Sequence, residues 1–444
     1  MRRTLLSFVL VLPGLVAAAC VKGTPDYVGF TDLHGGDLEL ADCGYKVTTG
    51  EGAEAPALGL LVFGDDPTPK NVHLGIAGDP RTSMVVDWAT EDQSTLATTV
   101  RFAKGRNLAP EQLTETRTGL TWAYQTGFGS VARDRFRIHE THLCGLAPDT
   151  EYSYQAGSSR GWSPVYHFRT APDVTADPSA EVVLAFVGDS RAGYDVWEQL
   201  TEQIAERTPD LILFSGDAVQ FGQVQDEWEE FFGRAEALLA TVPTIAAHGN
   251  HESNSAAYYA QFALPGDEQN YSIDYGFAHI TVLNDTPTDA AAIAGSTKQF
   301  LRDDLAAHQD ARWKIVMHHK PPFSASTRHG ADNTLQREWF PIVDQNDVDL
   351  VLSGHDHDFE QSKPLVWNAS QQQGQVVSDA SLGTVFVVSG GAGADLYPSG
   401  TDFWTEYSEK THSAAILQVN GVRLGMDAFR PDGSAVYQPF VKNK

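Results

Sequence analysis

Carboxylate, amide and imidazole side chains recur in five short motifs, and each motif directly follows an apolar run. The motifs read Gly188-Asp189, Gly216-Asp217, Gly249-Asn250-His251-Glu252, His318-His319 and Gly354-His355-Asp356-His357. Together they offer two carboxylates, one amide oxygen and three imidazoles as candidate metal ligands: Asp189, Asp217, Asn250, His319, His355 and His357. Such a mixture suits Zn, Fe(II) or Mn better than Ca. One carboxylate could bridge two ions.

Each motif has an ordinary structural explanation when it is taken alone. Asp189 could cap a helix, and a single Gly-Asp after a strand is more often structural. His355 and His357 could belong to a surface turn, although alternation along an extended segment points both imidazoles to one side. The occurrence of all five motifs in this order favours one shared metal site.

The segments around the motifs predict how they are positioned. From residue 182 onward, apolar runs alternate with helical patterns such as Val196 to Arg207 and Asp226 to Leu239, which indicates a layered α/β domain. In such domains functional loops gather at the carboxyl ends of strands, so we expect the motifs to converge. We also expect each preceding glycine to be needed because a side chain there would crowd the ion.

Residues 71–172 carry short alternating apolar segments separated by turn residues, which predicts a β-sandwich. We expect Trp88, Tyr152 and Tyr154 to fill its core. The run from Leu143 to Tyr154 resembles the strand-turn-strand signature of fibronectin type III modules. A stretch rich in Pro, Asp and Ala follows, so we place a second, catalytic domain at residues 180–444.

The composition limits the classes of partner. The 444 residues are 42% hydrophobic, enough for two domains, and 58 acidic against 31 basic side chains give a net charge of -27. This charge repels nucleic acid and anionic lipid headgroups, so neither is expected as a partner. A phosphate-binding site would need metal ions or arginine to reverse the field locally.

The N-terminus indicates an exported protein. Residues 1–19 combine Arg2 and Arg3 with an apolar stretch and end in small residues before Cys20, as in a signal peptide too short to span a membrane. Either Cys20 is lipidated in a bacterial cell-envelope lipoprotein, or the protein is simply secreted. Residues 20–70 then form a linker or accessory segment. Cys43 and Cys144 would pair in an oxidising compartment, or remain two unrelated thiols.

The motif series resembles the calcineurin-like metallophosphoesterase superfamily over about residues 180–395. The preceding sandwich and the runs from Tyr271 to Gly276 and from Gly354 to Glu360 are similar to purple acid phosphatases, whose fibronectin-like domain lies just upstream. The resemblance implies a catalytic domain of two sheets flanked by helices. It also implies hydrolysis of phosphate esters, foremost monoesters and with phosphodiesters as the near alternative, through two ions (Fe, Zn or Mn) and a bridging hydroxide.

The resemblance also implies a role for each motif residue. Asp217 would bridge the ions, Asp189 and His357 would bind the first ion, and the second would take the remaining ligands: Asn250, His319 and His355. His251 would act on the phosphate as the catalytic residue, with Glu252 orienting its neighbours. Similarity to the family motif selects His319 over His318, which would lie behind it.

Two positions depart from the family. Gln220 stands where purple acid phosphatases have the tyrosine that gives their colour, and Arg191 stands where other members have a histidine. We therefore expect no purple colour and weak binding of the first ion. Gln220 or Tyr194 could supply a ligand, or Arg191 could hold the substrate phosphate. The alternative function is a lipid-anchored, metal-dependent phosphate-binding or adhesive module with little turnover, favoured only by Arg191 and Gln220.

Overall fold

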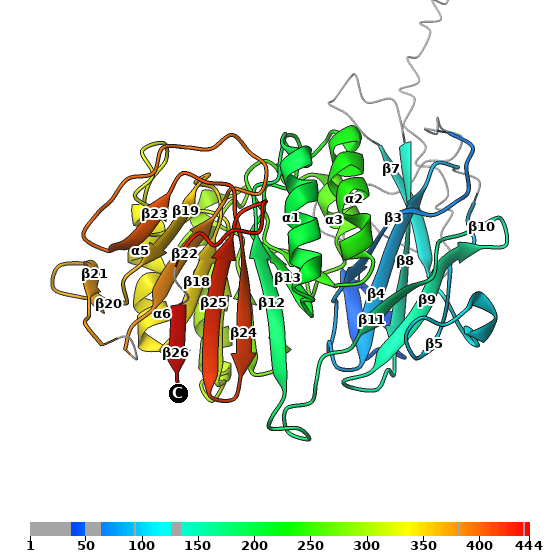
Figure 1. Ribbon diagram of the computed structural model, residues 1–444, viewed down its shortest axis with the longest axis horizontal. Coiled ribbons are helices and arrows are strands. Elements are labelled where there is room, and N and C mark those ends of the chain that lie inside the picture. Colours follow the sequence, from blue (N-terminus) through cyan, green and yellow to red (C-terminus); the bar gives the residue numbers. More distant parts are fainter. Residues whose placement is uncertain (1–36, 49–63, 93–94, 126–134, 380–381, 438–439) are drawn as a thin grey trace, which may run out of the picture.

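The computed structural model describes residues 37–48, 64–92, 95–125, 135–379, 382–437 and 440–444 (Figure 1). The expected signal peptide and Cys20 lie outside these residues. The predicted accessory segment contributes a hairpin of β1 (Asp37–Leu40) and β2 (Tyr45–Thr48). Cys43, in the turn of this hairpin, forms a disulfide with Cys144, and their Cα atoms are 5.1 Å apart.

The β-rich N-terminal region contains a five-stranded sheet that packs on the end of a larger one. Its strands are β10 (Gly161–Trp162), β9 (Glu151–Ser158), β5 (Thr99–Lys104), β6 (Glu115–Thr118) and β11 (Tyr166–Arg169). Trp88, Tyr152 and Tyr154 are at most 2% exposed in the core between the sheets, which confirms their expected packing. The Tyr154 hydroxyl also donates to the Ala240 carbonyl, 2.7 Å away, just after helix α2 (Gln225–Leu239).

The larger sheet has ten strands and runs through both regions of the chain. In spatial order it comprises β26 (Phe440–Asn443), β25 (Arg423–Phe429), β24 (Ala414–Asn420), β12 (Glu181–Val187), β13 (Leu211–Phe214), β14 (Thr244–Ala246), β3 (Lys70–Gly75), β4 (Ser83–Thr90), β8 (Arg135–Cys144) and β7 (Leu120–Gln125). The parallel pair β14–β3 joins the regions at Thr244 and Gly75. The sandwich is therefore hydrogen-bonded into the catalytic sheet.

A seven-stranded sheet forms the second half of the α/β region. It comprises β15 (Tyr271–Tyr275), β16 (Ala278–Val282), β17 (Trp313–Met317), β18 (Leu350–Ser353), β22 (Val385–Ser389), β19 (Phe359–Ser362) and β23 (Thr405–Glu409), with a small hairpin of β20 (Leu365–Asn368) and β21 (Gln373–Val376) beside it. The described α-helices are α1 (Tyr194–Glu206), α2 (Gln225–Leu239), α3 (Ala256–Gln261), α4 (Ser296–Ala307), α5 (Asn333–Glu338) and α6 (Phe340–Gln345).

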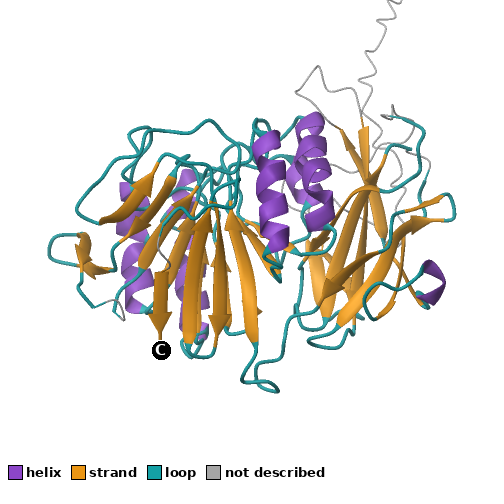
Figure 2. Cartoon of the chain, in the orientation of Figure 1, coloured by secondary structure: helices purple, strands orange, loops and turns teal. Residues whose placement is uncertain are grey.

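Alternation along the strands places the two sheets between two helical layers. On β17, Ile315 belongs to the main core shared with the ten-stranded sheet, whereas Val316 faces the cluster formed with α4, α5 and α6. On the other side, Trp197 of α1 packs edge-on against Phe214 of β13. The two groups of helices are separate in Figure 2. The predicted two-sheet α/β domain, the preceding β-sandwich, and the helices expected at 196–207 and 226–239 are confirmed.

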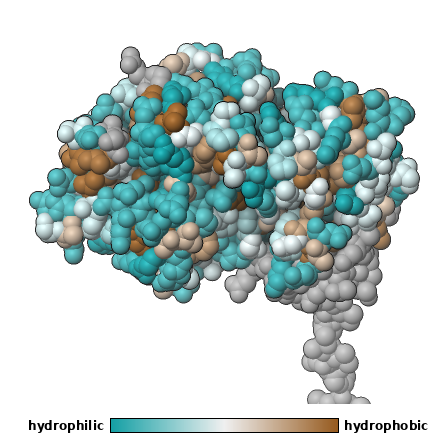
Figure 3. Space-filling model, turned by 90° about the horizontal axis from the view of Figure 1, so that it is seen from below, coloured by the Kyte–Doolittle hydropathy of each residue, from teal (hydrophilic) through white to brown (hydrophobic). Residues whose placement is uncertain are grey.

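None of the described helices is long and apolar enough to cross a bilayer. Seen from below, hydrophilic residues dominate the described surface, and the brown apolar patches are separated from one another (Figure 3).

Candidate metal centre

Five strand ends bring the motif residues together from both sheets. Strands β12, β13 and β14 of the ten-stranded sheet run parallel and lead to Asp189, Asp217 and Asn250. Strands β17 and β18 of the seven-stranded sheet are also parallel and lead to His319 and His355. The loops meet where both sets of strands end, so convergence depends on how the two sheets stack and not on one sheet edge alone.

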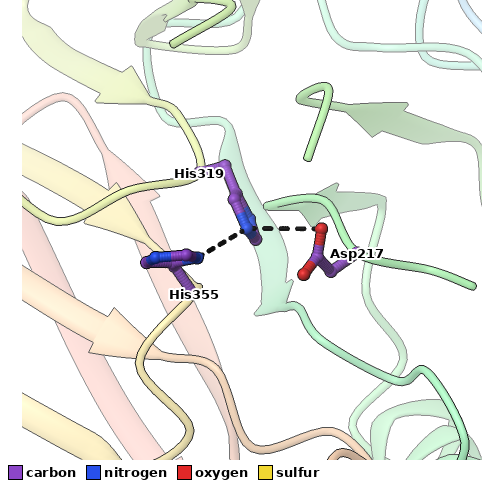
Figure 4. A group of neighbouring side chains, drawn as sticks. All are labelled: Asp217, His319 and His355. Atoms are coloured by element: carbon purple, nitrogen blue, oxygen red, sulfur yellow. Dashed lines mark hydrogen bonds and ion pairs between the residues drawn. The ribbon is translucent and has the colours of Figure 1, made fainter. Parts of the chain in front are cut away.

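Asp217, His319 and His355 form the centre of this cluster (Figure 4). His319 Nε2 lies 3.3 Å from Asp217 Oδ1, 3.2 Å from His355 Nδ1 and 3.1 Å from Asn250 Oδ1. One donor atom from each of Asp217, His319 and His355 lies within 4.8 Å of the other two. Four donor atoms from four loops therefore point at one small volume, as a cation site requires.

Backbone carbonyls decide which nitrogen faces the centre in two of the imidazoles. His319 Nδ1 donates to the Ser215 carbonyl over 2.8 Å, and His357 Nδ1 donates to the Asp395 carbonyl over 2.7 Å. A carbonyl can only accept, so each Nδ1 carries a proton and Nε2 is the nitrogen that faces the centre. A metal ligand needs this arrangement, with Nε2 deprotonated when the ion binds.

The pKa shifts of these residues also indicate that the centre favours positive charge. Burial alone would raise the pKa of Asp217, but His319 and His251 outweigh burial and hold this pKa well below its usual range. Burial would lower the pKa of His319, but the adjacent Asp217 carboxylate raises it to about 10. The pKa of His355 is lowered by burial and by His319. The carboxylate and the imidazoles therefore converge on a position that favours positive charge, as a metal site does.

The ligand loops are held in costly backbone conformations. Asp189, Asp217 and His355 have φ values of 62°, 58° and 67°, in the left-handed region that residues with a Cβ rarely adopt. The preceding glycines also have a steric role toward the ligands: a Cβ on Gly354 would overlap Asp189 Oδ2, and one on Gly249 would overlap Asp217 Oδ1. These glycines therefore make room for neighbouring ligand side chains.

Glu252 ties two of the ligand loops together. Its carboxylate accepts hydrogen bonds from the backbone N–H groups of Asp217 (3.0 Å), Ala218 (2.8 Å) and Gly249 (2.8 Å). Burial and the nearby Asp217 charge raise the pKa of Glu252 to about 7. The expected orienting role of Glu252 agrees with this geometry.

The residues expected to bind the first ion do not converge on one empty position, because Arg191 lies among them. Asp189 Oδ2 accepts from the His355 N–H, whereas its buried Oδ1 has no hydrogen-bond partner among the described residues. His357 Nε2 lies 3.5 Å from Asp189 Oδ1, but it also lies 3.2 Å from Nη2 of Arg191. Arg191 Nη1 donates to Gln220 Oε1 over 2.5 Å. The two residues that depart from the family therefore bond to each other.

A pocket of about 620 Å³ opens onto the centre. Besides motif residues, it is lined by side chains that sequence reasoning did not select: Arg328, Asp395 and Tyr397. Tyr397 stacks on the His357 ring at 4.0 Å between centroids. The sequence signal nearest to it is the glycine run at 390–393, which lies against the Asp189 loop because the Ala394 N–H donates to the Asp189 carbonyl over 2.9 Å. His329 also lines the pocket, with its ring 4.4 Å from that of His355.

Other polar residues near the motifs are placed as structural groups. His318 is buried behind the centre, where its Nδ1 lies 3.0 Å from Asp285 Oδ2, so of the adjacent pair only His319 faces the cluster. His248 is also buried and lies 2.8 Å from the Thr286 hydroxyl. Tyr194 begins α1 and packs against the main core.

His251 Nδ1 donates to the Gln220 carbonyl over 2.7 Å, which leaves Nε2 on the side of Asp217, 3.8 Å away.

The residues present supply a full set of donors for the second ion and only part of a set for the first. Asp217, Asn250, His319 and His355 supply converging oxygen and nitrogen atoms for one cation. The unpartnered Asp189 Oδ1 fits a ligand for another cation, but Arg191 already contacts the remaining donors of that position.

Two family models and several known proteins match this chain. The model of the calcineurin-like phosphoesterases matches residues 182–359, and that of the purple acid phosphatase N-terminal domain matches residues 69–170. Acid phosphatase type 7 of Mus musculus is 30% identical, covering 74% of this chain and 78% of its own. Purple acid phosphatase 21 of Arabidopsis thaliana is 26% identical over 67% of each. The purple acid phosphatase PPD1 from yellow lupin seeds superposes with a TM-score of 0.69 at 20% identity, covering 84% of this chain and 74% of its own, and so shares the fold.

Proposed function

The chain belongs to the calcineurin-like metallophosphoesterases of purple acid phosphatase type and hydrolyses phosphate esters with metal ions; from this premise we propose that its substrates are phosphomonoesters. The single observation that carries the proposal is the convergence of Asp217, Asn250, His319 and His355 beneath an open pocket. The family implies a dinuclear metal centre, and we propose Fe, Zn or Mn as its ions because the ligands mix imidazoles with oxygen donors.

The side chains around the pocket are suited to a phosphate group. When bound, the ions supply Lewis-acid charge to the phosphoryl oxygens and lower the pKa of the attacking water. Arg328, on the pocket wall, can donate hydrogen bonds to phosphate oxygens. His251 is fixed through Nδ1, so its Nε2, when protonated, can donate to the leaving alkoxide. Two arginines and four histidines line the pocket, so positive charge and hydrogen-bond donors face an entering phosphate in a protein that carries a net charge of -27.

The test combines metal analysis with hydrolysis of p-nitrophenyl phosphate by the purified protein. We expect wild type to bind metal and turn over this monoester, and Asp217→Ala to lose both properties. Asp303→Ala, on an exposed position of α4, is the matched control and should keep both. Faster hydrolysis of bis(p-nitrophenyl) phosphate would overturn the monoester proposal. Bound metal without turnover of either ester would support the phosphate-binding alternative.

We also propose that the protein is exported and anchored through a lipid on Cys20. The Cys43–Cys144 disulfide supports export, because disulfides persist in oxidising compartments. Incorporation of labelled palmitate into wild type but not into Cys20→Ser would support the anchor. Recovery of unlabelled wild-type protein from the medium would favour simple secretion instead.

A further inference from the structure

The first half of the centre, defined by the donors Asp189, Asp217 and His357, already contains a cation that belongs to the chain. The Arg191 guanidinium places Nε 3.3 Å from Asp217 Oδ2 and Nη2 3.2 Å from His357 Nε2. Arginine can only donate hydrogen bonds, and His357 Nδ1 is committed to a backbone carbonyl. The His357 lone pair that would bind a metal therefore faces Arg191.

The fold holds Arg191 in this position. Its backbone N–H donates to the Asp217 carbonyl over 3.3 Å, and its side chain is only 14% exposed. Ala192, the next residue, has a φ of 62°. A Cβ on Gly193 would overlap the Gly393 carbonyl, so the loop is wedged against the opposite wall. Gln220 completes the arrangement by accepting from Nη1.

We propose that Arg191 is a built-in competitor of the first metal ion, so that the chain binds one ion tightly and a second ion only by displacing the guanidinium. This inference rests on the proposed function of the same centre. The physical reason is charge: arginine stays protonated, and it cannot share Asp217 Oδ2 and His357 Nε2 with a divalent cation without strong repulsion. The second half has no such competitor, because its donors face one another.

The first half is not fully satisfied by Arg191, and this argues for exchange over permanent replacement. Asp189 Oδ1 is buried and has no hydrogen-bond partner among the described residues, which is costly for a carboxylate. An entering ion would satisfy this oxygen. Arg191 also lines the pocket, so the displaced side chain has space to occupy.

The first experiment measures metal binding without turnover. Metal-stripped protein is titrated with Zn²⁺ by calorimetry, and the metal retained after dialysis is counted by mass spectrometry. For wild type we expect about one retained ion and a second, weaker binding step. Arg191→Met, which keeps the length of the stem but removes the charge, should retain two ions and bind the second at least about tenfold more tightly. Arg191→Ala repeats the test with a smaller side chain.

Arg328→Met is the matched control, because Arg328 lies over Tyr397 in the same pocket and its charge should not compete for the first ion. It should bind like wild type. If wild type bound two ions with equal affinity and both Arg191 variants did the same, the inference would be overturned and the proposed function would remain intact. A wild-type chain that binds no ion would overturn both.

A spectroscopic measurement checks the same point independently. Gln220→Tyr restores the residue that gives purple acid phosphatases their colour, but Arg191 would still face the first half. With Fe(III), we expect the visible absorption band in Gln220→Tyr combined with Arg191→Ala, and little of it in Gln220→Tyr alone. An equally strong band in both proteins would contradict competition by Arg191.

Discussion

Two clusters of imidazoles and carboxylates in this protein have similar composition and different hydrogen bonding. One is the Asp217–His319–His355 cluster, and the other consists of Asp274, His279 and His308 on the seven-stranded sheet and after α4. In the first cluster, His319 Nδ1 donates to a backbone carbonyl, and only Nε2 faces the other donors. In the second, His279 lies 2.8 Å from Asp274 and 3.0 Å from Asp304, so both nitrogens face carboxylates.

The two clusters differ in what holds each nitrogen of the central imidazole. A carbonyl holds Nδ1 of His319, so Nε2 faces Asp217, Asn250 and His355, and a cation can replace a proton there. At His279 each nitrogen is paired with a carboxylate, Nδ1 with Asp274 and Nε2 with Asp304. Burial would lower the pKa of His279, but Asp274 and Asp304 outweigh it and raise the pKa to about 9. We therefore expect the second cluster to stabilise the fold and not to bind the catalytic ions.

The largest expected effect tests the comparison directly. His319→Ala should lower kcat/KM for p-nitrophenyl phosphate by at least about 1,000-fold, because it removes a ligand of the tightly held ion. His279→Ala should leave kcat/KM of the folded protein within about threefold, because its cluster takes no part in the reaction. Steady-state kinetics of both variants, with folding checked by circular dichroism, makes the measurement. Equal losses in the two variants would erase the distinction between the clusters.

The next effect lies within the metal centre. His357→Ala should lower kcat/KM by about 100-fold while the protein retains its tight ion, because His357 faces Arg191 and the weaker position. His319→Ala should lose the tight ion. Metal content after dialysis, compared between these two His→Ala variants, is the readout. Loss of all metal from His357→Ala would show that the two halves bind as a unit.

A smaller effect concerns the group that holds the ligand loops. Glu252→Gln should destabilise the protein by about 2 kcal/mol, because an amide oxygen cannot replace a carboxylate that accepts three backbone N–H groups. Urea unfolding of metal-stripped protein measures this directly. Glu338→Gln, which changes a partly exposed carboxylate paired with Lys298, is the control and should cost at most about 1 kcal/mol.

The smallest effect is the pH dependence of the second cluster. Because the pKa of His279 is raised from 6.5 to about 9 in the folded protein, its contribution is complete below pH 6.5 and is lost as pH rises through 9. Relative to His279→Asn, wild type should lose roughly 1 to 3 kcal/mol of stability between pH 6 and pH 10. Denaturant unfolding at several pH values tests this, and a difference between the two proteins that does not change with pH would exclude a protonated His279.

The features of the fold and site that could be predicted are those that depend on a few adjacent residues. Apolar runs ending in Gly-Asp, Gly-Asn-His-Glu and Gly-His-x-His gave the strands, and the alternating aromatic segments gave the sandwich core. The continuity of the two regions through Thr244 and Gly75 was not predictable, because parallel pairing between strands about 170 residues apart leaves no local pattern. Tyr397 was missed for a similar reason, since its stacking on His357 depends on a glycine-rich loop folding back.

By itself, the amino-acid sequence determined which chemical groups stand at the strand ends, because side-chain type and the turn after a strand are properties of a few adjacent residues. It also marked Arg191 and Gln220 as unusual, without deciding between a ligand and a phosphate-binding role. Only the tertiary structure decided that Arg191 contacts Asp217 and His357, and which nitrogen each histidine presents. Those outcomes depend on partners 26 to 166 residues away, which are brought together by strand pairing within a sheet for Arg191 and Asp217 and by the stacking of the two sheets for Arg191 and His357.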